Sequence, residues 1–284
     1  MRGHGWVGLL IIALAEAGLF AGQPLVARWF TPIVWTGYVL FVDALLFHRI
    51  GASYLTTARA ELVLVVLASI GCWWLFEWYD APRFWRGGAH RVGLWWQYHG
   101  LEPDPWLRRA GYDWSFATIF PALFLTAALL RSAVFRRIPV RPRRPSPALL
   151  KASIALGAIF VSVPLLVVNV WLVPLVWTGF VLLLEPLNYR RGRPSWLGAL
   201  AVGDASLLVA LLTSGLVCGV LWEFWNYWAD EVDVHGAVSR RREGLRDAAR
   251  RLSGVSAVCA GVLRHVPLAA RPPGPPARGA GVRV

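Results

Sequence analysis

Two stretches of this chain, residues 32–55 and 174–197, have nearly the same sequence. PIVWTGYVLFVDALLFHRIGASYL and PLVWTGFVLLLEPLNYRRGRPSWL are identical at 11 of 24 positions without a gap. A second match follows, CWWLFEWYD from Cys72 and CGVLWEFWN from Cys218, in which each Cys lies five residues before a Glu. Self-similarity of this kind is the signature of a duplicated structural unit. The sequence therefore predicts two tandem repeats.

The composition indicates that these units lie in a membrane. The chain is 57% hydrophobic and only 16% charged, whereas an average soluble domain is about 25% charged. Runs of about 20 apolar residues are typical of transmembrane helices. We therefore predict an all-α, polytopic transmembrane helical bundle. The seven predicted spans cover approximately residues 6–22, 31–48, 61–79, 115–135, 150–171, 173–189 and 204–228.

The repeat divides the chain into four predicted segments. Residues 1–135 form a first unit of four spans, and residues 136–147 form a basic, proline-rich cytoplasmic linker whose prolines oppose a helix. Residues 148–228 repeat the first three spans, so this second unit lacks its last span. Residues 229–284 contain no Phe, Trp or Tyr. This tail has two interpretations, a disordered basic segment or the out-of-frame product of a GC-rich gene.

The positive charge indicates orientation rather than nucleic-acid binding. Residues 234–284 hold ten Arg against Glu243 and Asp247, which accounts for +8 of the net charge of +13. The loops after the second, fourth and sixth spans are also rich in Arg. The positive-inside rule then places the N-terminus in the cytoplasm and residues 80–114 outside. We expect a multi-pass protein of the bacterial plasma (inner) membrane. As an alternative, residues 1–17 resemble a cleavable signal peptide.

Two acids occupy matched positions within predicted spans. Asp43 and Glu185 each lie 11 residues after the proline of their repeat, about 16 Å along a helix, and we expect both near the middle of the membrane. A charge there costs about 2.5–3.5 kcal/mol. The two carboxylates could bind a proton or a cation, or they could make structural bonds to neighbouring side chains.

A second matched pair, Glu77 and Glu223, lies near the predicted outer ends of two spans, among aromatic residues. Aromatic walls around a carboxylate could hold a cation, a sugar or a lipid headgroup. The same residues could instead form an interfacial aromatic belt. The Trp-Thr-Gly motif of each repeat favours close helix packing. The polar and aromatic candidates that could support these acids are Trp35, Thr36, Trp177, Thr178, Trp78, Trp222 and Asn226.

The sequence assigns no catalytic residue, because it contains no Walker loop, nucleophile elbow, HExxH or dinucleotide fingerprint. We expect no metal and no cofactor, and the expected partner is the lipid bilayer rather than nucleic acid. Over about residues 30–228, the repeat motifs resemble uncharacterised bacterial multi-pass membrane proteins, which implies no activity. The leading hypothesis is a structural or scaffold membrane protein. The alternatives are a proton- or cation-coupled transporter that uses mid-membrane acids, and an intramembrane enzyme acting on a lipid or isoprenoid.

Overall fold

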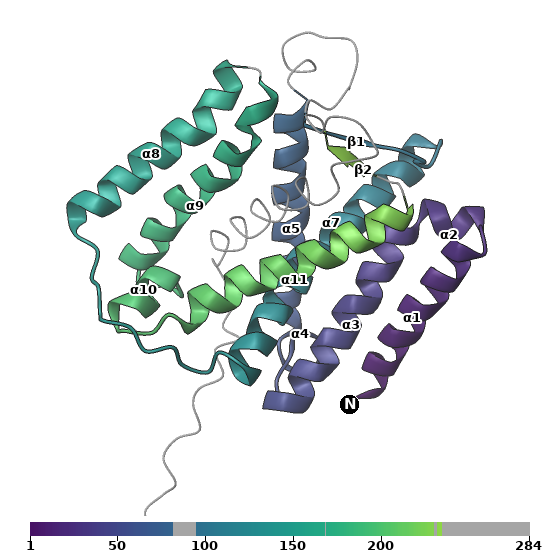
Figure 1. Ribbon diagram of the computed structural model, residues 1–284, viewed down its shortest axis with the longest axis horizontal. Coiled ribbons are helices and arrows are strands. Elements are labelled where there is room, and N and C mark those ends of the chain that lie inside the picture. The colour runs from purple at the N-terminus through teal and green to yellow at the C-terminus, as the bar shows by residue number, and fades with distance from the viewer. Residues whose placement is uncertain (82–94, 168, 230–231, 235–284) are drawn as a thin grey trace, which may run out of the picture.

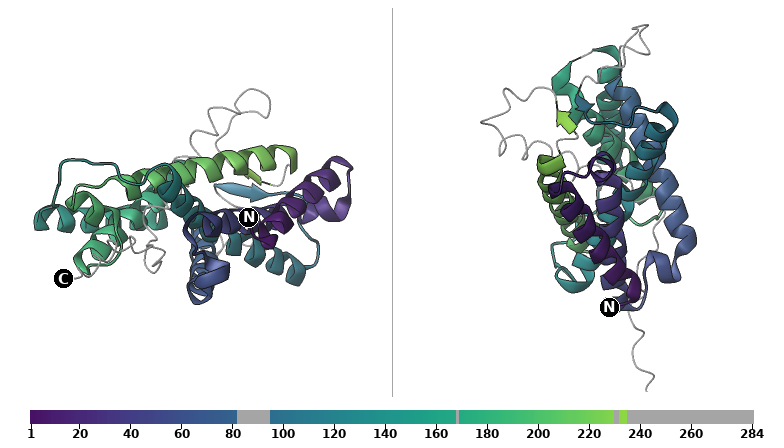
Figure 2. Two further views of the ribbon diagram at one scale, coloured as in Figure 1. Left: turned by 90° about the horizontal axis from the view of Figure 1, so that it is seen from below. Right: turned by 90° about the vertical axis from the view of Figure 1, so that its right-hand side faces the viewer.

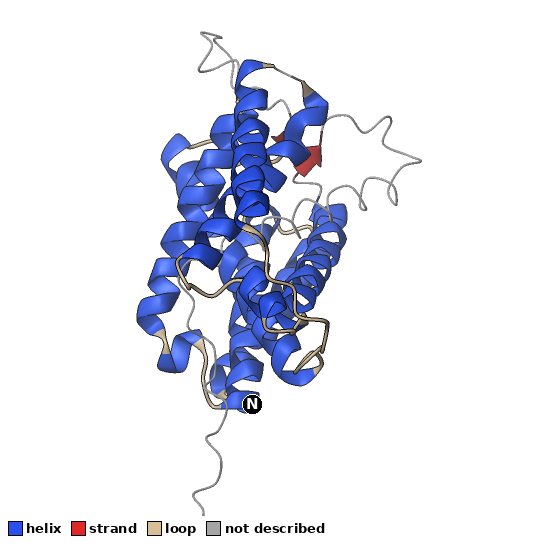
Figure 3. Cartoon of the chain, turned by 90° about the vertical axis from the view of Figure 1, so that its left-hand side faces the viewer, coloured by secondary structure: helices blue, strands red, loops and turns tan. Residues whose placement is uncertain are grey.

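The chain is helical almost throughout the residues that the computed structural model describes, which are 1–81, 95–167, 169–229 and 232–234. The long helices are α1 (Gly3–Phe20), α3 (Phe30–Ile50), α5 (Arg59–Asp80), α7 (Pro105–Ala133), α8 (Pro147–Leu166), α9 (Val173–Arg190) and α11 (Ser206–Ala229). The short helices are α2 (Pro24–Arg28), α4 (Tyr54–Thr57), α10 (Trp196–Ala201) and the 3-10 helix η1 (Val170–Leu172). An antiparallel pair of strands, β1 (Trp96–Tyr98) and β2 (Val232–Val234), lies near one end of the molecule (Figure 3). The sequence did not predict this small sheet.

Six helices of the described chain are long and apolar enough to cross a membrane: α1, α3, α5, α7, α8 and α11. These six helices confirm the prediction of a helical, multi-pass membrane protein, without fixing the number of spans. The helix α9 forms where a seventh span was predicted, but it is not among the six. Its C-terminal half contains Glu185, Asn188 and Arg190, which lower its hydropathy. The count of seven spans therefore stays a prediction.

Two helical hairpins lie on opposite sides of the molecule (Figure 1). The helices α1 and α3 form one hairpin, and α8 and α9 form the other. The helices α5 and α7 lie between the hairpins, and α7 packs against α3, α5 and α11. Seen from below, α11 runs along one side of the molecule, over the central helices (Figure 2).

Close glycine contacts hold each hairpin together. A Cβ atom placed on Gly37, in the Trp-Thr-Gly motif of α3, would lie 2.7 Å from the carbonyl oxygen of Gly8 in α1. A Cβ atom on Gly157 in α8 would lie 2.8 Å from the carbonyl oxygen of Gly179, in the same motif of α9. Only a hydrogen atom fits at either position, so the glycines let the two backbones approach closely.

The burial pattern separates one central helix from several peripheral ones. Every residue of α7 between Phe120 and Ala127 is buried, as expected for a helix that is surrounded on all sides. The peripheral helices α1, α5, α8 and α11 instead expose large apolar side chains. Apolar surface of this extent suits lipid better than water. Examples are Leu10, Leu14, Leu64, Leu67, Leu156, Ile159, Leu216 and Val220.

The basic linker is non-helical over residues 136–146 and runs beside the connection between α10 and α11. The N–H of Val140 donates to the carbonyl oxygen of Gly203 over 3.0 Å, and the N–H of Ile138 donates to Asp204 over 3.2 Å. Partial burial alone would raise the pKa of Asp204, but the N–H groups of Ser206 and Ile138 lower it below its usual value. The linker is thus bonded to the second half of the chain.

Candidate functional site

Asp43 is a fully buried acid that bonds to the beginning of the short helix α4. Its Oδ1 accepts the N–H of Leu55 over 3.1 Å, and its Oδ2 accepts the hydroxyl of Ser53 over 2.8 Å. The Nε2 of His4 in α1 lies 3.1 Å from Oδ2. Carboxylates at a helix N-terminus satisfy N–H groups that have no partner within the helix. Asp43 therefore ties α3 to the chain segment that follows it.

Glu185 makes the corresponding bond in the second repeat. Its side chain is 1% exposed, and Oε1 accepts the N–H of Leu197, at the beginning of α10, over 2.8 Å. The acid precedes the donor by 12 residues in both repeats. Ser195 caps α10, because its hydroxyl accepts the N–H of Gly198 over 2.9 Å. Both acids thus make structural hydrogen bonds, which was one of the two interpretations of the sequence. The donors are backbone N–H groups and the hydroxyl of Ser53.

The surroundings of Glu185 differ from those of its matched acid. Its second oxygen, Oε2, is buried and has no hydrogen-bond partner in the described part of the chain. The same is true of Nδ2 of Asn188, three residues later, and of Nε1 of Trp196 in α10. In the first repeat, Leu46 and Tyr54 occupy the matched positions. In the described part of the chain, the second repeat therefore contains three buried polar atoms without partners, whereas in the first repeat the carboxylate is bonded at both oxygens and the Tyr54 hydroxyl is the matched group without a partner.

Asp43 lies in the C-terminal half of α3, and its expected place near the middle of the membrane stays a prediction. Asp43 lies seven residues before Ile50, the last residue of α3, or about 10 Å from that end at 1.5 Å per residue. This brings the carboxylate within reach of the chain that turns back after α3. The prediction treated the acid as part of an isolated helix, whereas in the structure the following segment returns to meet it.

Glu77 holds the strand β1 at the other end of the molecule. Its Oε1 accepts Nε1–H of Trp96 over 3.1 Å and the hydroxyl of Tyr98 over 2.6 Å. Asp80, one turn later in α5, accepts the N–H of Trp95 over 2.6 Å. Burial raises the pKa of Tyr98 well above its usual value, and the Glu77 carboxylate raises it further. The phenol therefore stays protonated and keeps donating to Glu77.

Two of the supporting candidates, Thr36 and Trp177, contact other parts of the fold. The Thr36 hydroxyl donates to the carbonyl oxygen of Pro32 over 2.7 Å and accepts Nε1–H of Trp114 over 2.9 Å. The ring of Trp177 stacks on Trp96 at a centroid distance of 6.4 Å. Three further candidates, Thr178, Glu223 and Asn226, are partly buried in α9 and α11, and Trp78 is 42% exposed.

The end of α5 contacts the hairpin of the second unit. The hydroxyl of Tyr79 donates to the carbonyl oxygen of Val161 in α8 over 2.8 Å. The same ring packs edge-on against Phe180 in α9 at a centroid distance of 6.4 Å. Tyr79 lies two residues after Glu77. The Glu-containing motif of the first unit therefore contacts the other unit.

The end of α11 makes the reciprocal contact with the hairpin of the first unit. Trp225, which occupies the position matched to Tyr79, donates Nε1–H to Glu16 of α1 over 3.0 Å. Its ring packs against Trp35, with centroids 5.1 Å apart, and against Tyr38, with centroids 6.4 Å apart. Tyr38 occupies the position matched to Phe180. Of the predicted candidates, Trp35 thus belongs to a contact between the two units.

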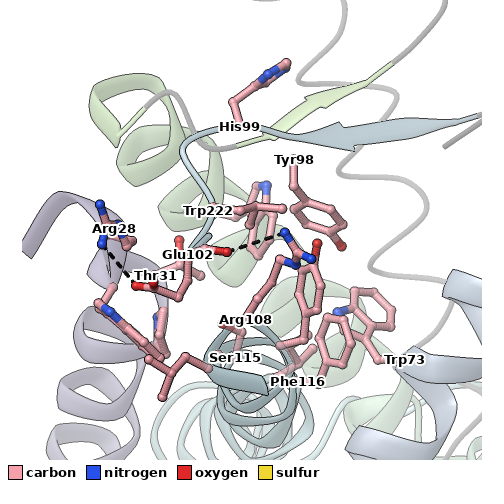
Figure 4. Close-up of a pocket in the computed structure, with 17 residues that line it drawn as sticks. Arg28, Thr31, Trp73, Tyr98, His99, Glu102, Arg108, Ser115, Phe116 and Trp222 are labelled. Atoms are coloured by element: carbon pink, nitrogen blue, oxygen red, sulfur yellow. Dashed lines mark hydrogen bonds and ion pairs between the residues drawn. The ribbon is translucent and has the colours of Figure 1, made fainter. Parts of the chain in front are cut away.

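A pocket opens at the same end of the molecule as β1, between α3, α5, α7 and α11 (Figure 4). Of the predicted candidates, only Trp222 lines it, although Glu77 bonds to a second lining residue, Tyr98. Sequence reasoning missed its charged residues, which come from distant segments with no shared motif. These are Arg28, Glu102 and Arg108.

The acid partners in the two repeats could have been found from the sequence. Ser53 and Ser195 are among the 11 identities of the repeat, and Ser is a preferred N-cap residue. A Ser that recurs ten residues after each acid is therefore a usable signal for the bonds seen at Asp43 and Glu185.

No known protein family, curated protein or solved structure matches this chain. The resemblance to uncharacterised bacterial multi-pass membrane proteins therefore stays a prediction. The fold and the site together define an integral membrane protein by its six apolar helices, and they assign no activity.

Proposed function

We propose that this protein is a structural, or scaffold, component of the bacterial plasma membrane. The observation that carries the proposal is the bonding of Asp43 and Glu185, the two acids that the sequence offered as candidates for proton or cation binding. Each bonds to the beginning of a short helix 12 residues later. Glu77, the third candidate acid, bonds to the side chains of Trp96 and Tyr98. In this proposal, the acids shape the helix connections.

We also propose that the scaffold consists of two repeats that exchange their third helices. The contacts of Tyr79 and Trp225 support this, since matched residues reach the hairpin of the opposite unit. Such an exchange locks the two units together, because a residue of each third helix bonds to the hairpin of the other unit. The aromatic clusters around Glu77 and Glu223 then serve mainly to join the units.

A proton- or cation-coupled transporter is a second candidate, favoured by one observation. Oε2 of Glu185 is buried without a partner in the described chain, and a carboxylate in that situation gains from binding a proton or a cation. For an intramembrane enzyme the support is weaker. The acid that lines the pocket, Glu102, is engaged by Arg28 at 3.0 Å.

Proton flux across a liposome membrane separates these functions. The full chain is reconstituted with a trapped pH-sensitive dye, and a potassium gradient with valinomycin supplies the driving force. A scaffold gives the same flux as protein-free liposomes, and the Glu185→Gln variant changes nothing. A flux above that background that Glu185→Gln abolishes and Asp43→Asn preserves would overturn the scaffold proposal and establish the transporter.

A further inference from the structure

The pocket between α3, α5, α7 and α11 contains one cation that has no acidic partner among the residues that the structure describes. Arg28 and Glu102 form an ion pair at 3.0 Å, so their charges offset each other. Arg108 donates only to the carbonyl oxygen of Glu102, over 3.4 Å, and no carboxylate of the described chain lies within ion-pair distance of it. The lining of the pocket is therefore left with one net positive charge.

Arg108 extends from α7 toward the middle of the pocket, between Glu102 and Tyr98 (Figure 4). His99 points away from the other labelled side chains. The remaining walls are largely aromatic and include Trp29, Trp73, Tyr112, Phe116 and Trp222. The pocket thus combines a guanidinium group with apolar ring surfaces.

The mouth of the pocket is also apolar. Leu107, which lines the pocket, is 52% exposed, and Trp106 beside it is 84% exposed. Both lie in the first turn of α7, one of the six apolar helices. Exposed Trp at the end of a membrane span is typical of the headgroup region of a bilayer. A ligand that enters here meets one cation and a hydrophobic entrance.

We propose that this pocket binds the phosphate headgroup of an anionic phospholipid. The planar guanidinium group of Arg108 can donate two parallel hydrogen bonds to phosphate oxygens. The acyl chains then leave along Trp106 and Leu107 into the surrounding lipid. The inference concerns ligand binding and does not depend on the scaffold role, because it uses none of the matched acids directly.

Calorimetric titration of the purified full chain in detergent tests the proposal. The probe is dihexanoyl phosphatidylglycerol, used below its critical micelle concentration. Arg108→Gln removes the charge, and we expect about tenfold weaker binding, in keeping with the loss of a charge-assisted hydrogen bond. Arg109→Gln is the matched control, since Arg109 lies on the same helix but pairs with Asp113 at 3.1 Å, outside the pocket. Equal affinities of these two variants would overturn the proposal.

A second variant keeps the test decisive if Arg108→Gln does not fold. Glu102→Gln removes the partner of Arg28, so the pocket gains a positive charge and should bind the probe more tightly than the wild type. Unchanged or weaker binding by folded Glu102→Gln would contradict the proposal. Inorganic phosphate and dihexanoyl phosphatidylcholine serve as competing probes. We expect both to bind more weakly, and equal binding of inorganic phosphate would show a site for phosphate rather than for a lipid.

Discussion

The matched acids show how two repeats can use one residue position differently. The carboxylate of Asp43 accepts hydrogen bonds at both oxygens, and His4 lies beside Oδ2. Glu185 uses one oxygen to hold α10 and leaves the other buried without a partner in the described chain. Desolvation of an unbonded oxygen is unfavourable. The two positions should therefore respond differently to removal of the charge.

We expect Asp43→Asn to destabilise the protein more than Glu185→Gln does. The Asn amide places a donor where Asp43 accepts bonds, which costs about 1–3 kcal/mol. The Gln side chain can keep its oxygen on the N–H of Leu197 and place its NH2 at the unbonded position, so we expect a change below about 1 kcal/mol. Thermal unfolding midpoints in one detergent measure the difference. A larger decrease in the unfolding midpoint for Glu185→Gln than for Asp43→Asn would show that the charge of Glu185 is needed for folding.

The hairpins show why the repeated motif carries glycine. A Cβ atom on Gly37, the motif glycine of α3, would meet the backbone of Gly8 as well as Ile side chains, and a Cβ atom on Gly157 in α8 would meet the backbone of Gly179, the motif glycine of α9. Backbone atoms cannot move aside without separating the helices. The tightness of the hairpin thus depends on two small residues in each unit.

We expect Gly37→Ala to lower stability by about 1–3 kcal/mol, the usual cost of overpacking a contact. Gly71→Ala in α5 is the matched control, because a Cβ atom at Gly71 meets nothing within 4 Å. Helix propensity favours the control substitution by up to about 1 kcal/mol. Thermal unfolding in detergent again provides the measurement. If both variants melted at the wild-type temperature, the close α1–α3 contact would not contribute to stability.

At the scale of the whole molecule, the matched helices α3 and α9 are buried to different extents by their neighbours. Ten residues of α3 are buried, but only five residues of α9. The reason is that α3 packs along α7 as well as along its hairpin partner α1, whereas in the described chain α9 packs along its partner α8 and otherwise mainly against the short elements α10 and η1. The predicted tail, residues 229–284, lies outside the described residues except for 229 and 232–234, so neither interpretation of it is tested. The second unit therefore presents more of its surface to its surroundings.

The orientation of the chain gives a prediction at this scale. If α7 crosses the membrane, positions before and after it must lie on opposite sides. In a variant without the native cysteines, we expect Pro103→Cys to react with an impermeant maleimide from outside the cell. We expect Ser146→Cys to react only after permeabilisation, because the Arg-rich linker should be cytoplasmic. Labelling of both positions from one side would show that α7 does not cross.

Much of the architecture followed from the sequence, because apolar length and helical propensity are local properties. The long helices, the non-helical linker and the matched positions of Asp43 and Glu185 could all be read from it. The bond from each acid to a Ser or backbone donor could have been inferred from the recurring Ser. The small sheet could not, since β1 and β2 are three-residue strands from distant parts of the chain.

Only the tertiary structure decided which surfaces meet. The contacts of Tyr79 and Trp225 with the opposite hairpins join helices that are far apart in the sequence, and no local pattern specifies such a partner. The same holds for the pocket, where the charge balance depends on the ion pair of Arg28 with Glu102, which leaves Arg108 without an acid in the described part of the chain. The sequence by itself determined a set of long apolar helices, and it predicts that they form two repeats. Tertiary packing determined which acids are satisfied and where a cation lies unpaired, because those properties depend on distances between side chains in space.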